Sequence, residues 1–77
     1  MNISRIKPGS KAIINGFKSG NREYKQKLLS MGLVPGAILK INKLSSMTDI
    51  VEIAINNFSL ILRLSEASII DLIEVSM

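Results

Sequence analysis

The sequence has no histidine, cysteine or tryptophan, and only 4% of its 77 residues are aromatic. Without cysteine there is neither a disulfide nor a thiolate nucleophile, and without histidine the commonest general base is absent. No serine has an adjacent base in the sequence, and no glycine-rich stretch forms a phosphate-binding pattern. These absences argue against an enzyme.

Long apolar runs are missing as well. No run approaches the roughly 18 residues that a membrane-spanning helix needs, and residues 1–9 do not contain the continuous apolar stretch of a secretory signal. We therefore expect a cytoplasmic protein. The length fits one small domain over residues 1–77, near the lower limit at which a single hydrophobic core suffices without disulfides or metals.

Acidic residues are scarce in the first part of the chain. Up to residue 43 there are nine lysines and arginines and one acidic residue, whereas residues 44–77 hold one arginine and five acidic residues. This asymmetry indicates a basic surface and an anionic or acidic partner for it. A basic domain with no such partner would have the same composition, so the charge pattern leaves both interpretations open.

One helix is predicted, over about residues 22–31. Tyr24, Leu28 and Met31 follow the i, i+4, i+7 spacing that places side chains on one helical face. We expect this face to pack on the core, and Met31 to be a core side chain.

Two glycines and a proline are expected to fix the path of the chain after this helix. Gly32 stands where a helix end needs a left-handed residue. Pro35 and Gly36 fit the two central positions of a type II turn, since proline presets φ and glycine accepts a positive φ. We assign all three residues a structural role rather than a role in binding.

Alternating isoleucines and leucines predict five short strands. These strands cover residues 10–17, 37–44, 50–55, 58–62 and 69–75. Asn56 and Asn57 are expected to form a type I′ hairpin turn, after which Phe58, Leu60 and Leu62 continue the buried face. A short helical turn is expected near residues 65–68. The predicted fold is mostly β, a small, strongly bent five-stranded barrel with one inserted helix.

Three blocks of the sequence, in this order, carry a resemblance to a known family. They are Ile6-Lys7-Pro8-Gly9, the stretch from Lys27 to Gly36, and the hairpin from Val51 to Arg63, which is followed by Glu66-Ala67. Together they resemble the ferrous-iron transport protein A (FeoA) family, whose fold is a small SH3-like barrel. The chain departs from the family pattern at Asn57, where glycine is frequent, and over residues 45–49, where proline and glycine are frequent.

The resemblance implies a cytoplasmic accessory or regulatory module of bacterial ferrous-iron uptake. The implied partner is the membrane ferrous-iron transporter, which carries a cytoplasmic G-protein domain. The same barrel also occurs fused to metal-dependent transcriptional repressors. Because no helix-turn-helix region precedes it in this sequence, we do not expect a complete repressor.

The best candidate for partner binding is the outward face of the predicted helix. Arg22, Lys25, Gln26 and Leu29 cluster opposite the apolar face on a helical wheel. An exposed Leu29 ringed by basic side chains would anchor an acidic, partly apolar partner. Alternatively, this is a solvated helix face with Leu29 half-buried under a loop. If the partner is a G domain, Arg22 is the best-placed arginine to reach its nucleotide in trans.

Metal ligands are restricted to carboxylates and thioethers, such as that of Met47. We expect no dedicated metal site and no tightly bound cofactor. Five carboxylates could bind a divalent ion weakly: Asp49, Glu52, Glu66, Asp71 and Glu74.

Two other functions are compatible with the composition. A basic β-barrel could bind nucleic acid, although the few aromatic residues offer little base stacking. The domain could also self-associate weakly through an edge of the barrel.

Overall fold

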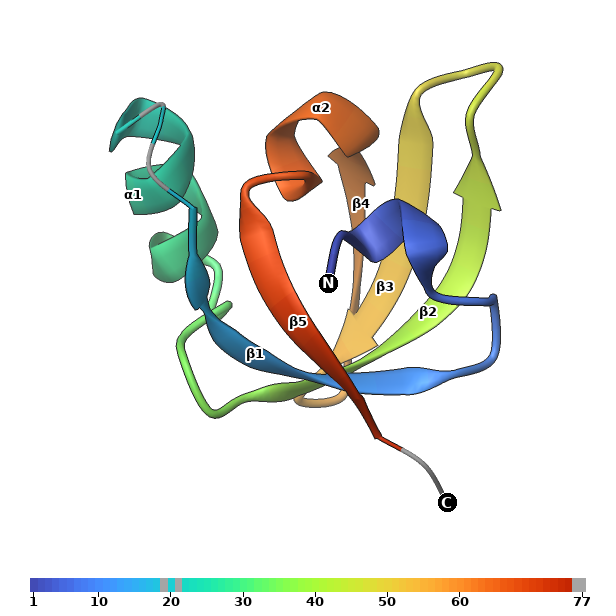
Figure 1. Cartoon of the computed structure of the whole chain (residues 1–77), viewed down its shortest axis with the longest axis horizontal. Coiled ribbons are helices and arrows are strands. Elements are labelled where there is room, and N and C mark those ends of the chain that lie inside the picture. The colour runs from blue at the N-terminus through green and yellow to red at the C-terminus, as the bar shows by residue number, and fades with distance from the viewer. Residues whose placement is uncertain (19, 21, 76–77) are drawn as a thin grey trace.

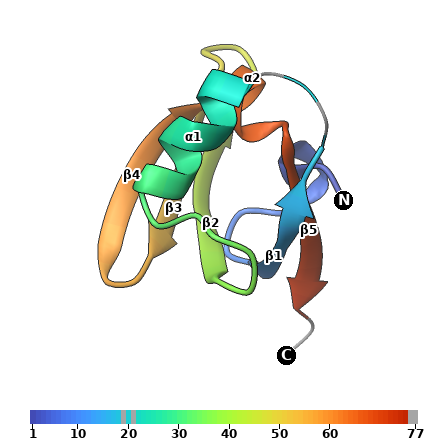
Figure 2. The same cartoon turned by 90° about the vertical axis from the view of Figure 1, so that its left-hand side faces the viewer.

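The computed structural model describes residues 1–18, 20 and 22–75, which form one strongly curved antiparallel sheet with short helices (Figures 1 and 2). The strand order is β4-β3-β2-β1-β5. The elements are η1 (Ile3–Arg5), β1 (Lys11–Phe17), α1 (Arg22–Ser30), β2 (Ile38–Ser45), β3 (Ile50–Ile55), β4 (Phe58–Arg63), α2 (Leu64–Ala67) and β5 (Ile70–Val75). No helix of the described residues is long and apolar enough to cross a membrane.

Two irregularities in the strand pairing accompany the curvature of the sheet. The register shifts between Ile14 and Gly16 where β1 pairs with β5, and between Ile41 and Lys43 where β2 pairs with β3. Such bulges bend a strand and increase its twist. No ladder joins β4 to β5 in the part of the chain that the structure describes, and α2 packs against β3, β4 and η1. The predicted mostly β fold is confirmed.

The core is built from aliphatic side chains on the concave face of the sheet. β1 contributes Ala12 and Ile14, as their alternation predicts, and β3 contributes Val51, Ile53 and Ile55. The remaining buried hydrophobic residues are Ile3, Ile6, Leu28, Leu33, Leu39, Ile41, Leu62, Ala67, Ile70 and Leu72. No aromatic side chain is fully buried within the described chain, so the core is filled by branched aliphatic groups.

The end of α1 has the predicted geometry. Gly32 has a φ of 91°, and its N–H donates to the Leu29 carbonyl over 3.1 Å. The Leu33 N–H donates to the Leu28 carbonyl over 3.1 Å. This pair of hydrogen bonds is the Schellman motif, in which a left-handed residue satisfies the last carbonyls of a helix.

The predicted type II turn is present immediately after this helix end. The Ala37 N–H donates to the Val34 carbonyl over 3.0 Å, and Gly36 has a φ of 93°. The structural assignments of Gly32, Pro35 and Gly36 therefore agree with the backbone that the structure shows.

The β3–β4 hairpin confirms one prediction and corrects another. Asn56 and Asn57 have φ values of 50° and 70°, as a type I′ turn requires. Phe58, however, is 67% exposed, so the prediction that it is buried was wrong. It pairs with the buried Ile55, but it lies at the end of the hairpin on the edge strand of the sheet, where no further strand covers it.

The helices differ slightly from their predicted limits. α1 ends at Ser30, one residue before the predicted end. α2 begins at Leu64, one residue before the helical turn predicted at 65–68, and the side chain of its N-cap residue Arg63 makes no capping hydrogen bond.

Candidate functional site

α1 is fixed to the core by its apolar face. Leu28 is fully buried, and Met31 is partly buried and packs against the core cluster. Tyr24 is half-buried on the same face. The predicted core face of the helix is thus confirmed, with Leu28 as its deepest residue.

An ion pair joins α1 to α2. Lys27 Nζ lies 2.9 Å from Glu66 Oε2, and the Glu66 side chain is only 11% exposed whereas that of Lys27 is 53% exposed. The hydrogen bond from Lys27 lowers the pKa of Glu66 below its usual value, although burial opposes this effect. Glu66, which the sequence offered as a possible metal ligand, is therefore already paired within the fold.

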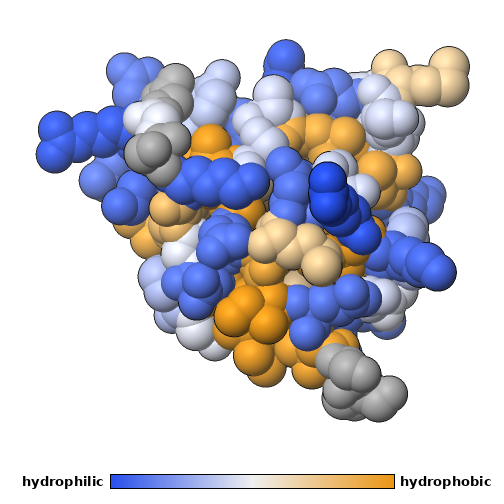
Figure 3. All heavy atoms as spheres, in the orientation of Figure 1, coloured by the Kyte–Doolittle hydropathy of each residue, from blue (hydrophilic) through white to orange (hydrophobic). Residues whose placement is uncertain are grey.

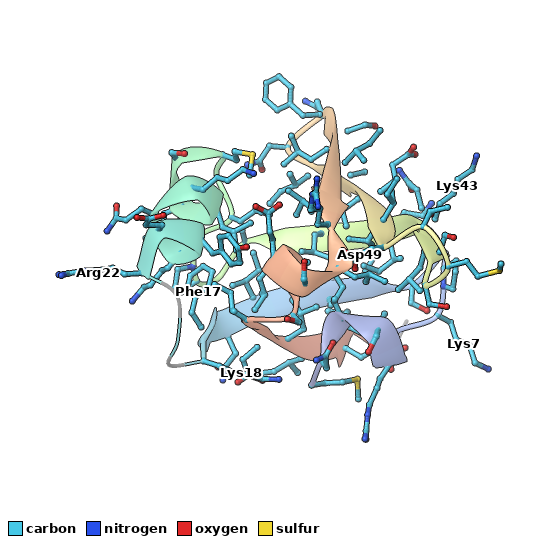
Figure 4. The ribbon with its side chains drawn as sticks, turned by 90° about the horizontal axis from the view of Figure 1, so that it is seen from above. Lys7, Phe17, Lys18, Arg22, Lys43 and Asp49 are labelled. Atoms are coloured by element: carbon cyan, nitrogen blue, oxygen red, sulfur yellow. The ribbon has the colours of Figure 1, made fainter. Side chains whose placement is uncertain are left out.

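The outward face of α1 carries the side chains that the sequence predicted for partner binding. Arg22, Lys25 and Gln26 are exposed, and Leu29 is half-buried. Arg22 extends away from the fold at the start of the helix (Figure 4). Leu29 therefore offers a partner only part of its side chain. We call this set, Arg22, Lys25, Gln26 and Leu29, the α1 face.

One member of the α1 face is restrained by an aromatic ring. Lys25 Nζ lies 5.8 Å from the centroid of the Phe17 ring, within the range of a cation–π interaction. Phe17 ends β1 and packs partly against the core. The ammonium group of Lys25 therefore lies near the end of β1.

The carboxylates do not come together in the described residues, where no three potential metal ligands form a group. Besides the pairing of Glu66, Asp71 Oδ2 accepts a hydrogen bond from Asn15 over 3.0 Å, and Asp71 Oδ1 lies 2.7 Å from the N-terminal ammonium. Asp49 accepts a hydrogen bond from the Ser65 hydroxyl over 3.3 Å.

The three aromatic residues belong to three different elements of the fold. Phe17 ends β1, Tyr24 lies on α1 and Phe58 begins β4 beyond the hairpin turn. A stacking platform for nucleic-acid bases needs neighbouring aromatic rings. This arrangement gives the nucleic-acid interpretation no additional support.

A set of exposed isoleucines was not identified as functional from the sequence. Ile38 and Ile73 are each 53% exposed and Ile61 is 68% exposed, all on the convex face of the sheet. One feature of the sequence pointed to these residues. Some strands carry consecutive apolar residues, such as Leu72-Ile73, which places an apolar side chain on each face of the sheet. This signal alone could not distinguish a buried second face from an exposed one.

A family model and several solved structures identify the family of this chain. A model of the FeoA domain matches residues 1–74. The solution structure of a FeoA protein from Chlorobium tepidum is 28% identical with a TM-score of 0.86, and the match covers 99% of this chain and 71% of that one. The crystal structure of an iron uptake regulatory protein (FeoA) is 25% identical with a TM-score of 0.86, and the match covers 97% of both chains.

The fold is named in the description of a structure with lower sequence identity. FeoA from Stenotrophomonas maltophilia, solved with zinc, is 17% identical with a TM-score of 0.79 over 94% of this chain and 88% of that one. It is described as a procaryotic SH3 domain protein and is suggested to act as a ferrous iron transport activating factor. The fold of the present chain is accordingly SH3-like. No curated protein matches the sequence significantly.

Proposed function

The chain belongs to the FeoA domain family, and from this membership we propose that it is an accessory module of bacterial ferrous-iron uptake. In this proposal the domain lies in the cytoplasm and regulates the membrane iron transporter by contact with the transporter's cytoplasmic G-protein region. The role suggested for the S. maltophilia protein, a ferrous iron transport activating factor, supports the link to transport.

The observation that carries this proposal is the α1 face. Its basic side chains project from a helix that Leu28 and the Lys27–Glu66 ion pair fix to the rest of the fold. These two contacts fix the position of the helix, and with it the side of the fold from which the basic side chains project. A partner surface with carboxylates around a small apolar contact for Leu29 complements it.

We propose that the domain acts by binding and not by catalysis. The sequence contains neither histidine nor cysteine, and two of its carboxylates, Glu66 and Asp71, are already paired with cations. The same features support the expectation that no metal or cofactor is tightly bound. The chemistry would then belong to the partner, whose nucleotide state the domain senses or changes.

Calorimetric titration of the domain into the G-protein region of the cell's ferrous-iron transporter tests the proposal. The titration is run with GDP and with a GTP analogue, each at two salt concentrations. We expect binding in at least one nucleotide state, weakened about tenfold by Lys25→Glu because this reversal places a negative charge opposite carboxylates. Leu29→Ala should weaken binding about fivefold, since only part of its side chain is available.

Lys43→Glu is the matched control, because Lys43 is an exposed lysine on β2 that lies outside the α1 face. It should leave the affinity within about twofold of that of the wild type. Binding that Lys25→Glu and Lys43→Glu weaken equally would contradict the proposed surface. No binding in either nucleotide state would contradict the proposed partner.

For Arg22 we propose a specific role in GTP hydrolysis by the partner. Its exposed side chain at the start of α1 is placed to enter the nucleotide site of a G domain and stabilise the transition state of GTP hydrolysis. If so, Arg22→Lys should retain most of the binding but lose the stimulation of hydrolysis, because lysine lacks the planar, bidentate guanidinium. Stimulation that survives Arg22→Lys, or hydrolysis that the wild-type domain leaves unchanged, would contradict this role.

A further inference from the structure

The convex face of the sheet carries an apolar row across three strands. Ile13 of β1 is in register with Ile38 of β2 on one side and with Ile73 of β5 on the other. Ile38 and Ile73 are each 53% exposed, and Ile13 is half-buried between them. In the space-filling view, hydrophobic atoms gather at the lower end of the molecule, where β5 crosses β1 (Figures 1 and 3). The solvent face of an antiparallel sheet normally carries polar residues, so three aligned isoleucines require an explanation.

Two lysines stand opposite each other beside this row. Lys11 of β1 is in register with Lys40 of β2, two residues along each strand from Ile13 and Ile38. Both are exposed, and neither forms an ion pair with any residue that the structure describes. Like charges directly opposite each other destabilise a sheet. A ligand that brings carboxylates to this position would relieve the repulsion.

We propose that this face, Ile13, Ile38 and Ile73 with Lys11 and Lys40, docks an acidic amphipathic helix of a partner protein. Neighbouring strands lie about 4.8 Å apart, so the three isoleucines span about 10 Å across the sheet. One turn of an α-helix rises about 5.4 Å, so apolar side chains at i, i+4 and i+7 match this row. Carboxylates on one flank of that helix then lie over the two lysines.

The same face is poorly suited to a lipid surface. Asp71 lies two residues before Ile73 on the convex side of β5, on the side of the row away from Lys11. An anionic membrane would therefore meet a carboxylate on one side of the row as well as lysines on the other, whereas a helix with carboxylates on one flank only can avoid Asp71. None of the three aromatic residues, which favour the membrane interface, belongs to β5, β2 or the apolar row.

A second copy of this chain does not offer the required helix. α1 carries three basic residues, Arg22, Lys25 and Lys27, against one acidic residue, Glu23. α2 is only four residues long, and its carboxylate, Glu66, is paired with Lys27. The charge and length of the described helices therefore point to a different protein as the partner.

This surface is separate from the α1 face. α1 lies over the open side of the curved sheet, whereas β1 and β5 cross at the opposite end of the molecule (Figures 1 and 2). The inference therefore does not depend on the function proposed for α1, and a variant of one surface leaves the other intact.

The test uses the full chain and a synthetic helical peptide with leucines at i, i+4 and i+7 and glutamates along one flank. Titration of the isotope-labelled domain at low salt should shift the amide resonances of β1, β2 and β5. We expect Ile38→Ser and Lys40→Glu each to weaken binding about tenfold. Ile61→Ser, at an exposed isoleucine of β4 outside the row, is the matched control and should bind as the wild type does.

Several results would overturn the inference. One is that Ile38→Ser binds the peptide as tightly as the wild type does, and another is that a peptide with lysines in place of the glutamates binds equally well. The inference would also fail if the amide shifts were confined to α1, or if the domain did not bind the peptide at low salt. Adsorption of the domain to vesicles of phosphatidylcholine and phosphatidylserine that Ile38→Ser abolishes would assign the face to lipid instead. If Ile38→Ser does not fold, as judged from its amide spectrum, Ile73→Ser takes its place.

Discussion

At the scale of single residues, the backbone of Gly32 determines where α1 ends. Its φ of 91° lies in the left-handed region, and a Cβ added there would meet only Asn56 Nδ2, at 3.8 Å. A Cβ at this position therefore fits the available space but strains the backbone.

Gly32→Val should lower the free energy of unfolding by about 1–2 kcal/mol, because a β-branched residue resists positive φ. For a domain of this size the melting temperature should fall by about 5 °C or more, measured by circular dichroism. Gly16→Ala is the control, since Gly16 does not have a positive φ and an added Cβ has nothing within 4 Å. A Gly32→Val protein as stable as the wild type would show that this φ is not needed.

The Lys27–Glu66 pair makes stability depend on pH. The pKa of Glu66 is lowered in the folded state, so its ionised form stabilises the fold above the ordinary glutamate pKa of about 4.3. This contribution is lost as the pH falls through the lower, folded-state pKa. Since Lys27 is half exposed, we expect solvent to reduce it to about 1 kcal/mol.

Glu66→Gln should therefore be less stable than the wild type at pH 7, and the difference should shrink below about pH 4.3. Urea unfolding at a series of pH values measures this difference. Glu74→Gln, which alters an exposed carboxylate of β5, should change the free energy of unfolding by less than about 0.5 kcal/mol. A difference between Glu66→Gln and the wild type that does not vary with pH would contradict the assigned role of the ion pair.

At the scale of the elements, the β3–β4 hairpin shows that two side chains on the same face of a strand can differ in burial. Phe58 and Leu62 point to the same side of β4, but Phe58 is 67% exposed and Leu62 only 4%. Phe58→Thr should change the free energy of unfolding by less than about 0.5 kcal/mol. Leu62→Ala should cost about 3 kcal/mol, because it leaves a cavity in the core. Urea unfolding compares the two, and a large cost for Phe58→Thr would mean that Phe58 is covered in solution.

The same hairpin shows how far the sequence determines the fold. The period-two alternation of residues 50–55 and the two asparagines predicted the strand, its buried face and its turn correctly, because these depend on local chemistry. The exposure of Phe58 depends on which strand stands at the edge of the sheet, and no local pattern contains that information.

For the candidate site, too, the sequence predicted the local features but not the contacts between distant segments. The helical wheel placed Arg22, Lys25 and Gln26 on the outward face, because helix periodicity is local. It could not show that Lys25 lies over Phe17, or that Lys27 pairs with Glu66 from a segment 39 residues away. The sequence also did not show that Lys11 of β1 lies opposite Lys40 of β2, because this depends on the register of the two strands.

At the scale of the whole molecule, folding partly neutralises the charge asymmetry of the sequence. β5 from the acidic end pairs with β1 from the basic end, and Glu66 neutralises Lys27. Exposed basic side chains remain on α1, on β1 and β2, and at Arg5, Lys7, Lys18 and Arg63. The exposed basic residues therefore come from several elements and are accompanied by exposed acidic residues such as Glu23 and Glu74, an arrangement that suits selective protein contacts better than a continuous polyanion.

Mapping the contact with the transporter's G-protein region by amide chemical shifts of the labelled domain tests the central claim most directly. We expect shifts on α1, centred on Lys25, Gln26 and Leu29, in at least one nucleotide state, and loss of these shifts in Lys25→Glu. Binding that leaves the α1 resonances unmoved, or no binding with either GDP or a GTP analogue, would contradict it.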